Sequence, residues 1–471
     1  MVSALRGTRA MTQASSPTVP APNGFFDVAW SILRLALPVT ATRAGLLIMI
    51  TIDTVMVGRA GTTELAHFAV AFPPQSVGFV VIIVLLSAGA VLAGQERGAG
   101  RPEQCGHIWR IALIVGASMG VLIGTLFQLG GWLLSVLGQV VEGGGKALAI
   151  WGLSMPGIAI YGATAMFLEV LGRPLPGLFI VILGNGVNAV LCWVLVYGEW
   201  GAPAMGGLGA VIATGIVRWL MAAAIVSYAL TMKDAQHWGV FGPLGSIRAG
   251  AGRLLRLGLP LSAASLIEIS AFFAFATFAG WLGTMSLAAY QIALNIMSTI
   301  YMAAIGISIA TSVHVSIAAG RARGDEIARA GWAGAAVLTV VMAVATILFV
   351  ALSSSIFTLY TADPALIAIL SALATLIAAI FFVDGLQMVL LSATRAVADV
   401  TVPAIIFLVA FGTIAIPLGY ALGPGGGAAA FMEGDPITLG VGGILIAALI
   451  SLTIASTLLA LRFAWLSRRA R

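Results

Sequence analysis

The segment LRLALP at residues 33–38 occurs again, with one substitution, as LRLGLP at residues 255–260. The two copies are 222 residues apart, since 255 minus 33 is 222. The same offset carries Gly98 onto Gly320 without a gap. One offset that holds across so much of a half-chain indicates an internal duplication.

The composition indicates that both halves lie in a membrane. Of the 471 residues, 60% are hydrophobic and 8% are charged, whereas a soluble domain carries about 25% charged residues. Segments of about 20 apolar residues, the length that crosses a bilayer as a helix, recur along the whole chain. We predict an all-α integral membrane protein with twelve spanning helices, at residues 32–57, 66–95, 107–129, 147–171, 175–198, 207–232, 254–281, 286–318, 329–357, 365–391, 401–422 and 440–464.

Six spans fall in each copy of the duplication, and six is an even number. Both halves therefore have the same orientation, and the repeat is parallel, with its pseudo-two-fold axis along the membrane normal. We expect two six-helix lobes that form a V around a central cleft, with substrate bound between them. The predicted domains are a disordered cytoplasmic N-terminus (1–24), an N-lobe (25–235), a cytoplasmic linker (236–250), a C-lobe (251–465) and a cytoplasmic tail (466–471).

The basic residues predict the orientation of the chain. Of the 23 lysines and arginines, 19 fall in or next to the termini and the loops that follow even-numbered spans. The opposite loops hold Arg59 and Lys146, and Arg43 and Arg218 lie inside spans. Because basic loops stay in the cytoplasm, we predict a multi-pass protein of the inner (plasma) membrane with both termini cytoplasmic. The net charge of +6 is spread over loops and forms no aromatic-studded patch, so it does not indicate a nucleic-acid partner.

The sequence lacks the usual motifs of energy-coupling or catalytic sites. There is no phosphate-binding loop, no HExxH, no nucleophile elbow, and the two cysteines have no metal-type spacing. We therefore expect no enzyme, no ATP and no cofactor, and an ion gradient as the source of energy.

Long motifs resemble the multidrug and toxic compound extrusion (MATE) family, in its NorM-like branch. The segments that carry the resemblance are LALPVTATRAGLLIMITIDTVMVGRAGTTELAHFAVA (35–71), GQERGAG (94–100), VYGEWGAPAMGGLGAVIATGIVRW (196–219), GLPLSAASLIEIS (258–270), LGTMSLAAYQIALNIMSTIYM (282–302) and VDGLQMVLLSATRAVAD (383–399). The resemblance implies a secondary antiporter, a functional monomer, that exports amphipathic organic cations such as drugs and toxins in exchange for Na⁺ or H⁺ by alternating access.

Three alternatives remain open. The chain could export one dedicated natural product, or it could be a lipid-linked precursor flippase of the wider superfamily, which predicts a strongly cationic cavity. A membrane-embedded enzyme would need paired catalytic groups at one depth, and Glu268 and Asp384 could pass as such a dyad.

Glu268 and Asp384 are the deepest acids of the C-lobe. They lie 12 and 11 residues from basic cytoplasmic positions, which places them roughly 18 and 16 Å deep. Acids within a bilayer usually mark ion pathways, and these two could share one cation, with Gln387 one turn from Asp384 as a further oxygen ligand. The resemblance implies that both acids bind the coupling ion, with Na⁺ as the candidate metal. The alternative is a structural pair satisfied by neighbouring polar groups.

Asp53 is the acid of the N-lobe, about 28 Å along the first span. The position is close to the outer surface, so the acid either reaches toward outside water or forms a second proton or cation site. The resemblance implies the second role and assigns Asn188 as its supporting residue. Some branches of the family have another acid where this chain has Cys192, a poor ligand for hard cations, which favours the C-lobe acids as the main coupling site.

Other polar residues within spans remain ambiguous. Arg218 either pairs with Asp53 or faces the cleft, where it would repel cations. Gln291 and Asn295, preceded by Tyr290, resemble the family's eighth-span motif and are predicted to line the cleft, although such amides also join helices.

Pro38 and Pro260 occupy equivalent positions near the start of each lobe. Proline removes a helical hydrogen bond and permits a bend. Each is therefore either a hinge for gating or a static kink.

Overall fold

The computed structural model describes residues 24–136, 142–243, 245–425 and 436–469, and within these ranges every regular element is helical. Twelve of the helices are long and apolar enough to cross a membrane, which confirms the predicted number of spans. The expected disorder at residues 1–23 and the last residues of the expected tail, 470–471, lie outside the described residues.

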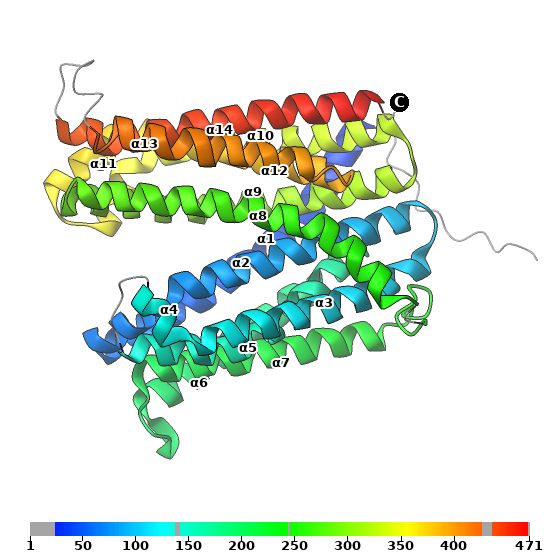
Figure 1. Cartoon of the computed structure of the whole chain (residues 1–471), viewed down its shortest axis with the longest axis horizontal. Coiled ribbons are helices and arrows are strands. Elements are labelled where there is room, and N and C mark those ends of the chain that lie inside the picture. The colour runs from blue at the N-terminus through cyan, green and yellow to red at the C-terminus, as the bar shows by residue number, and fades with distance from the viewer. Residues whose placement is uncertain (1–23, 137–141, 244, 426–435, 470–471) are drawn as a thin grey trace, which may run out of the picture.

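The helices of the two lobes group separately (Figure 1). The N-lobe comprises α1 (Phe25–Ala60), α2 (Thr62–Gly98), α3 (Pro102–Gln128), the short α4 (Gly130–Val136), α5 (Glu142–Val170), α6 (Leu175–Tyr197), a 3₁₀ turn (Glu199–Gly201) and α7 (Gly206–Thr231). The C-lobe comprises α8 (Ile247–Trp281), α9 (Thr284–Gly320), α10 (Gly324–Tyr360), α11 (Pro364–Ala396), α12 (Thr401–Phe407), a π-helical segment (Leu408–Ala415), α13 (Ile416–Leu422) and α14 (Pro436–Arg469).

Helix ends differ from the apolar segments that predicted them. α1 and α8 each begin seven residues earlier than the predicted spans, and α14 continues to Arg469 instead of ending at 464. Backbone hydrogen bonding continues past the hydrocarbon core into the interface, so hydropathy alone underestimates helix length. The two narrowest predicted breaks are nevertheless present, at 171–174 between α5 and α6 and at 282–283 between α8 and α9.

The duplication is visible in the architecture. A shift of 222 residues places α2 on α9 from its first residue to its last. The two helices cross closely at equivalent points, where a Cβ on Gly98 would collide with the Ile317 carbonyl and a Cβ on Gly320 with the Gln95 carbonyl. Because 95 plus 222 is 317 and 98 plus 222 is 320, this crossing lies on the pseudo-two-fold axis between the lobes.

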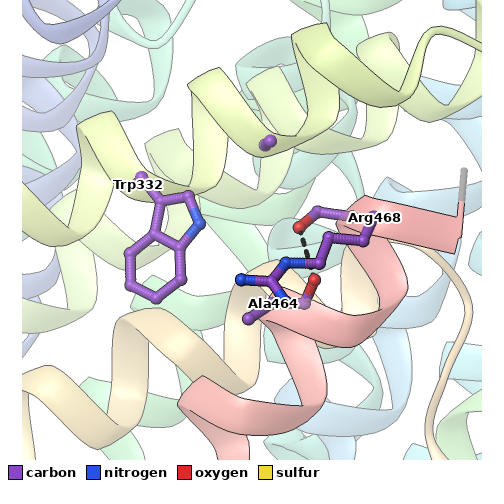
Figure 2. A pocket seen from close by; sticks show the side chains of 5 residues that line it. Trp332, Ala464 and Arg468 are labelled. Atoms are coloured by element: carbon purple, nitrogen blue, oxygen red, sulfur yellow. Dashed lines mark hydrogen bonds between the residues drawn. The ribbon is translucent and has the colours of Figure 1, made fainter. Parts of the chain in front are cut away.

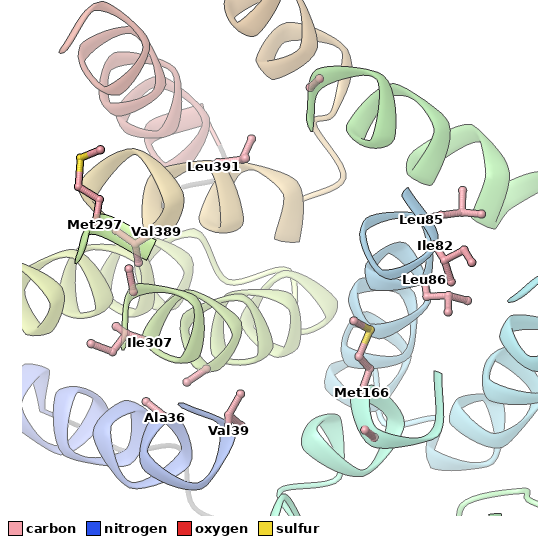
Figure 3. Close-up of a cluster of buried hydrophobic side chains, with 14 of the residues drawn as sticks. Ala36, Val39, Ile82, Leu85, Leu86, Met166, Met297, Ile307, Val389 and Leu391 are labelled. Atoms are coloured by element: carbon pink, nitrogen blue, oxygen red, sulfur yellow. The ribbon is translucent and has the colours of Figure 1, made fainter. Parts of the chain in front are cut away.

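The lobes meet near one end of the bundle, which we call the basic end because the loops that hold Arg101, Lys233, Arg321 and Arg323 lie there. Within the described residues, every hydrogen bond and ion pair between the lobes lies in the half of the bundle next to this end, including Ser31 with His314 and Gln95 with the Ala396 carbonyl. Figure 3 shows buried apolar side chains of α1 facing α9 in the same region. The molecule is therefore a V that is closed at the basic end and open at the other.

Candidate functional site

The two C-lobe acids are brought together from different helices. Glu268 lies on α8 and Asp384 on α11, and both side chains are half-buried. Their carboxylates are close enough for their charges to interact, and Tyr301 of α9 lies within electrostatic range of both. Gln387, one turn from Asp384, donates from Nε2 to Glu268 Oε1 at 2.9 Å. The structure therefore brings these three residues together, and their shared binding of one cation stays a prediction.

The Gln387 amide oxygen has no hydrogen-bond partner among the described residues. Its Oε1 is buried and accepts no hydrogen bond from any described residue, although buried polar atoms are nearly always paired. Together with two carboxylates it forms a set of hard oxygen donors, which suits a small cation or a proton. The described part of the chain holds no cluster of three or more His, Cys, Asp and Glu side chains, so the amide is needed to supplement the two acids.

The N-lobe acid is enclosed and saturated with donors. Asp53 is 1% exposed, so the interpretation that it reaches toward outside water is wrong. Its Oδ1 accepts from Asn188 Nδ2 at 2.6 Å and from the Cys192 thiol at 3.1 Å, and its Oδ2 accepts from Thr214 at 2.5 Å. α1 turns this face inward because α6 and α7 pack against it.

Asn188 therefore contacts Asp53 as predicted, and the Cys192 thiol donates a further hydrogen bond to the same carboxylate. Thr214 was missed by sequence reasoning, because a hydroxyl in an apolar helix usually bonds to its own backbone. A polar residue on α7 four residues before Arg218 was the available signal.

Arg218 takes neither of the two predicted roles. It is 6% exposed, and its Nη1 donates to Ser154 of α5 at 3.0 Å. It forms no ion pair with Asp53, although the two charges interact at longer range. It does not face the cleft, because α5 and α7 cover it within the N-lobe.

One buried ion pair was not predicted from the sequence. Arg43 of α1 and Glu169 of α5 form an ion pair of 3.0 Å, with both side chains buried. A buried pair of this kind needs both partners, because removal of one leaves an uncompensated charge. The sequence signal was that Arg43 lies within a span, but its partner 126 residues away could only be found in three dimensions.

The predicted cleft residues divide into two kinds. Gln291 and Asn295 on α9 are exposed, and Asn295 Oδ1 accepts from Tyr360 at 2.8 Å. Tyr290 is buried and donates to the Phe272 carbonyl at 3.1 Å. Its assignment to the cleft surface is wrong, since it joins α9 to α8.

α1 and α8 both continue as helices through their prolines, Pro38 and Pro260. The Thr42 hydroxyl donates to the Pro38 carbonyl at 2.8 Å. The hinge role of the two prolines stays a prediction.

Comparison with known proteins places this geometry in a family. The MatE family model matches residues 38–194 and 260–421, one segment in each lobe. The chain is 34% identical to the probable multidrug resistance protein NorM of Rhodopseudomonas palustris, with 93% of this chain and 92% of that protein covered. It is 31% identical to the probable multidrug resistance protein NorM of Caulobacter vibrioides, at the same coverage of both chains.

Solved structures agree in fold. The Vibrio cholerae MATE transporter VcmN in the bent form superposes with a TM-score of 0.82 at 17% identity, covering 95% of this chain and 98% of that one. The duplicated helical V, the twelve spans and the extended matches in both lobes lead to one assignment: the chain is a multi-pass membrane protein that belongs to the MatE family, a family of transporters and not of enzymes.

Proposed function

We propose that the chain is a secondary antiporter that exports amphipathic organic cations, drugs and toxins among them, in exchange for Na⁺ or H⁺. Relatives named as multidrug resistance proteins support export of such compounds. The observation that carries the coupling is the C-lobe site, where Glu268 and Asp384 lie beside the unpartnered oxygen of Gln387. One small cation or proton there would neutralise buried charge and satisfy the orphaned acceptor.

The orientation of the V supports alternating access. The basic end is the cytoplasmic end by the distribution of arginines, so both termini are cytoplasmic and the V opens outward. Binding of an ion to the two acids favours one arrangement of the lobes over the other, and the substrate gains access to alternate sides of the membrane. We propose that the ion gradient is the energy source, without ATP or a cofactor, and that the monomer is sufficient because each acid site is complete within one chain.

A cationic substrate agrees with the location of Arg218. A lipid-linked precursor flippase would need a cationic cavity, and Arg218 was the deep arginine that could have supplied it. Its burial against Ser154 leaves that positive charge inside the N-lobe. The two charged residues of the C-lobe site, Glu268 and Asp384, are acids, which favours binding of a cation.

The test is ethidium efflux from cells that express the wild type, Glu268→Gln or Asp384→Asn, with sodium and pH gradients varied separately. We expect gradient-driven efflux by the wild type and its collapse in both variants, with the effective gradient identifying the ion. Efflux that survives both substitutions would refute the C-lobe site. Wild-type protein that is present in the membrane but exports no ethidium would instead favour a dedicated natural-product substrate.

A further inference from the structure

A surface hollow lies between α10 and α14 at the basic end, far along the chain from the acid sites. Its volume is about 370 Å³, and it is lined by Ala328, Trp332, Ala464, Ser467 and Arg468. Figure 2 shows the Trp332 ring on one side and the Arg468 side chain on the other, with Ala464 between them. The two alanines create the space, because larger residues at these positions would fill it.

The walls of the hollow combine an apolar surface with one cation. Trp332 is 38% exposed and packs edge-on against Phe463 of α14, so its ring is fixed at the rim. The Ser467 hydroxyl donates to the Ala464 carbonyl of its own helix at 3.0 Å. Its hydrogen atom is therefore not available to a ligand in the hollow. The floor is therefore apolar, and Arg468 supplies the charge.

Among the described residues, Arg468 has no acidic partner. Nearby acids are already matched, since Asp399 pairs with Arg462 at 2.6 Å and Glu326 pairs with Arg321 at 3.1 Å. The neighbouring acid Asp325 lies 3.9 Å from Arg329. In the described part of the chain the Arg468 guanidinium has neither an ion pair nor a hydrogen bond from its side chain.

Arg469 is its matched neighbour on the same helix. The Arg469 guanidinium lies over the Trp465 ring at 5.1 Å, and Arg469 does not line the hollow. The two arginines therefore have the same charge and nearly the same depth. Arg469 lies over an aromatic ring, whereas Arg468 lies beside an apolar cavity.

We propose that this hollow is a binding site for an anionic phospholipid of the cytoplasmic leaflet. Arg468 binds the phosphodiester as a bidentate donor, and an acyl chain enters the hollow along Trp332, whose position matches the aromatic belt of the interface. Basic pockets between spanning helices on the cytoplasmic side are suited to anionic headgroups, because that leaflet is negatively charged. The assignment to this leaflet rests on the orientation in the proposed function.

The hollow also borders a helix, α14, that packs on an element of the proposed coupling site. α14 packs on α11, which carries Asp384, so a lipid bridging α10 and α14 holds the two helices together at the end where the V is closed.

The test uses the purified full-length chain in detergent, titrated with phosphatidylglycerol or with phosphatidylcholine, with lipid retention read by native mass spectrometry and stability by the unfolding midpoint. We expect phosphatidylglycerol to bind more tightly than phosphatidylcholine and to raise the midpoint. Arg468→Gln should weaken phosphatidylglycerol binding about fivefold, the usual contribution of one basic residue near an anionic surface, and Arg469→Gln should leave it unchanged.

Ala464→Leu separates the cavity from the charge, because it fills the hollow and retains Arg468. We expect it to abolish the selective binding as well. Equal losses in Arg468→Gln and Arg469→Gln, or wild-type binding by Ala464→Leu, would overturn the proposal in favour of diffuse attraction to a basic surface. Equal binding of both lipids by the wild type would also overturn it. These measurements need no transport, so a failure of the lipid proposal can be distinguished from a failure of the proposed efflux function.

Discussion

The acids of the two lobes are held in opposite ways. Asp53 of the N-lobe is fully buried and accepts from three donors, with the Arg218 charge in the same lobe. The C-lobe acids are half-buried, and the Gln387 amide donates to Glu268 alone, while its own oxygen accepts from no described residue. A duplicated scaffold has therefore produced one closed polar network and one open site.

The difference indicates at which acids an ion can bind with the smaller free-energy cost. A cation at Asp53 would have to displace donors that already satisfy its oxygens, and buried polar atoms left unpaired cost about 1–3 kcal/mol each. A cation at Glu268 and Asp384 relieves repulsion between two acids and satisfies a free acceptor. We therefore expect the C-lobe to couple the ion and the N-lobe network to stabilise its own lobe.

The largest expected effect concerns the C-lobe acids as one unit. Glu268→Gln, Asp384→Asn and the double variant should each reduce gradient-driven efflux by about tenfold or more, within the usual range of coupling energies. The double variant should lose little beyond either single variant, because removal of one ligand already disables the site. Efflux rates in proteoliposomes with an imposed gradient measure this. Losses that multiply would indicate two independent sites.

Asp53→Asn should act on stability more than on coupling. The substitution leaves Arg218 buried without its long-range counter-charge and gives Thr214 and Cys192 a weaker acceptor, so unfolding should become easier by about 1–3 kcal/mol. Thermal unfolding in detergent measures the loss, with Asp363→Asn, an exposed acid that caps α11, as the control. If Asp53→Asn abolishes the ion dependence of efflux at a normal protein level, the contrast between the lobes is wrong.

A matched pair of amide substitutions sharpens the contrast. Gln387→Leu removes the unpartnered oxygen, and we expect the ion concentration for half-maximal efflux to rise about fivefold, since coupling terms of this kind begin near 1 kcal/mol. Asn188→Leu removes an equivalent amide from the N-lobe network and should leave that concentration unchanged. The same shift in both variants would mean that the two lobes contribute alike.

The smallest effect is expected at Asp234, a carboxylate outside the membrane that accepts several hydrogen bonds. Burial opposes its ionisation, but one hydrogen bond from Trp238, at 2.7 Å, and two from Arg173, at 2.8 and 2.9 Å, outweigh burial and hold the pKa of Asp234 below its usual value. Because the folded pKa is depressed, the stabilisation is present above the unfolded pKa of about 3.9 and disappears as the pH falls through the folded value.

Asp234→Asn should therefore lower the unfolding midpoint slightly at neutral pH. The midpoints of the wild type and the variant should converge as the solution is acidified below pH about 4. A constant difference across this range would mean that the carboxylate contributes by shape and not by charge.

Several features could be predicted from the sequence because they depend on local chemistry or on counting. Apolar runs predict spanning helices, since lipid forces the backbone to satisfy its own hydrogen bonds. A constant offset predicts the duplication, and the close crossing at Gly98 and Gly320 confirms it. Depth along a helix predicts that Glu268 and Asp384 could meet, because both are counted from the same membrane face.

The tertiary structure decided which polar groups touch. Depth along α1 placed Asp53 near the outer surface, but the packing of α6 and α7 buried it, and Thr214 came into its shell from a helix more than 150 residues away. Arg218 and Tyr290 were misassigned for the same reason, since hydropathy gives the depth of a residue and not the direction of its side chain. The sequence by itself determined the spans, the repeat and the candidate acids, whereas the rotation of each helix against its neighbours decided which acid is enclosed and which stays open to an ion.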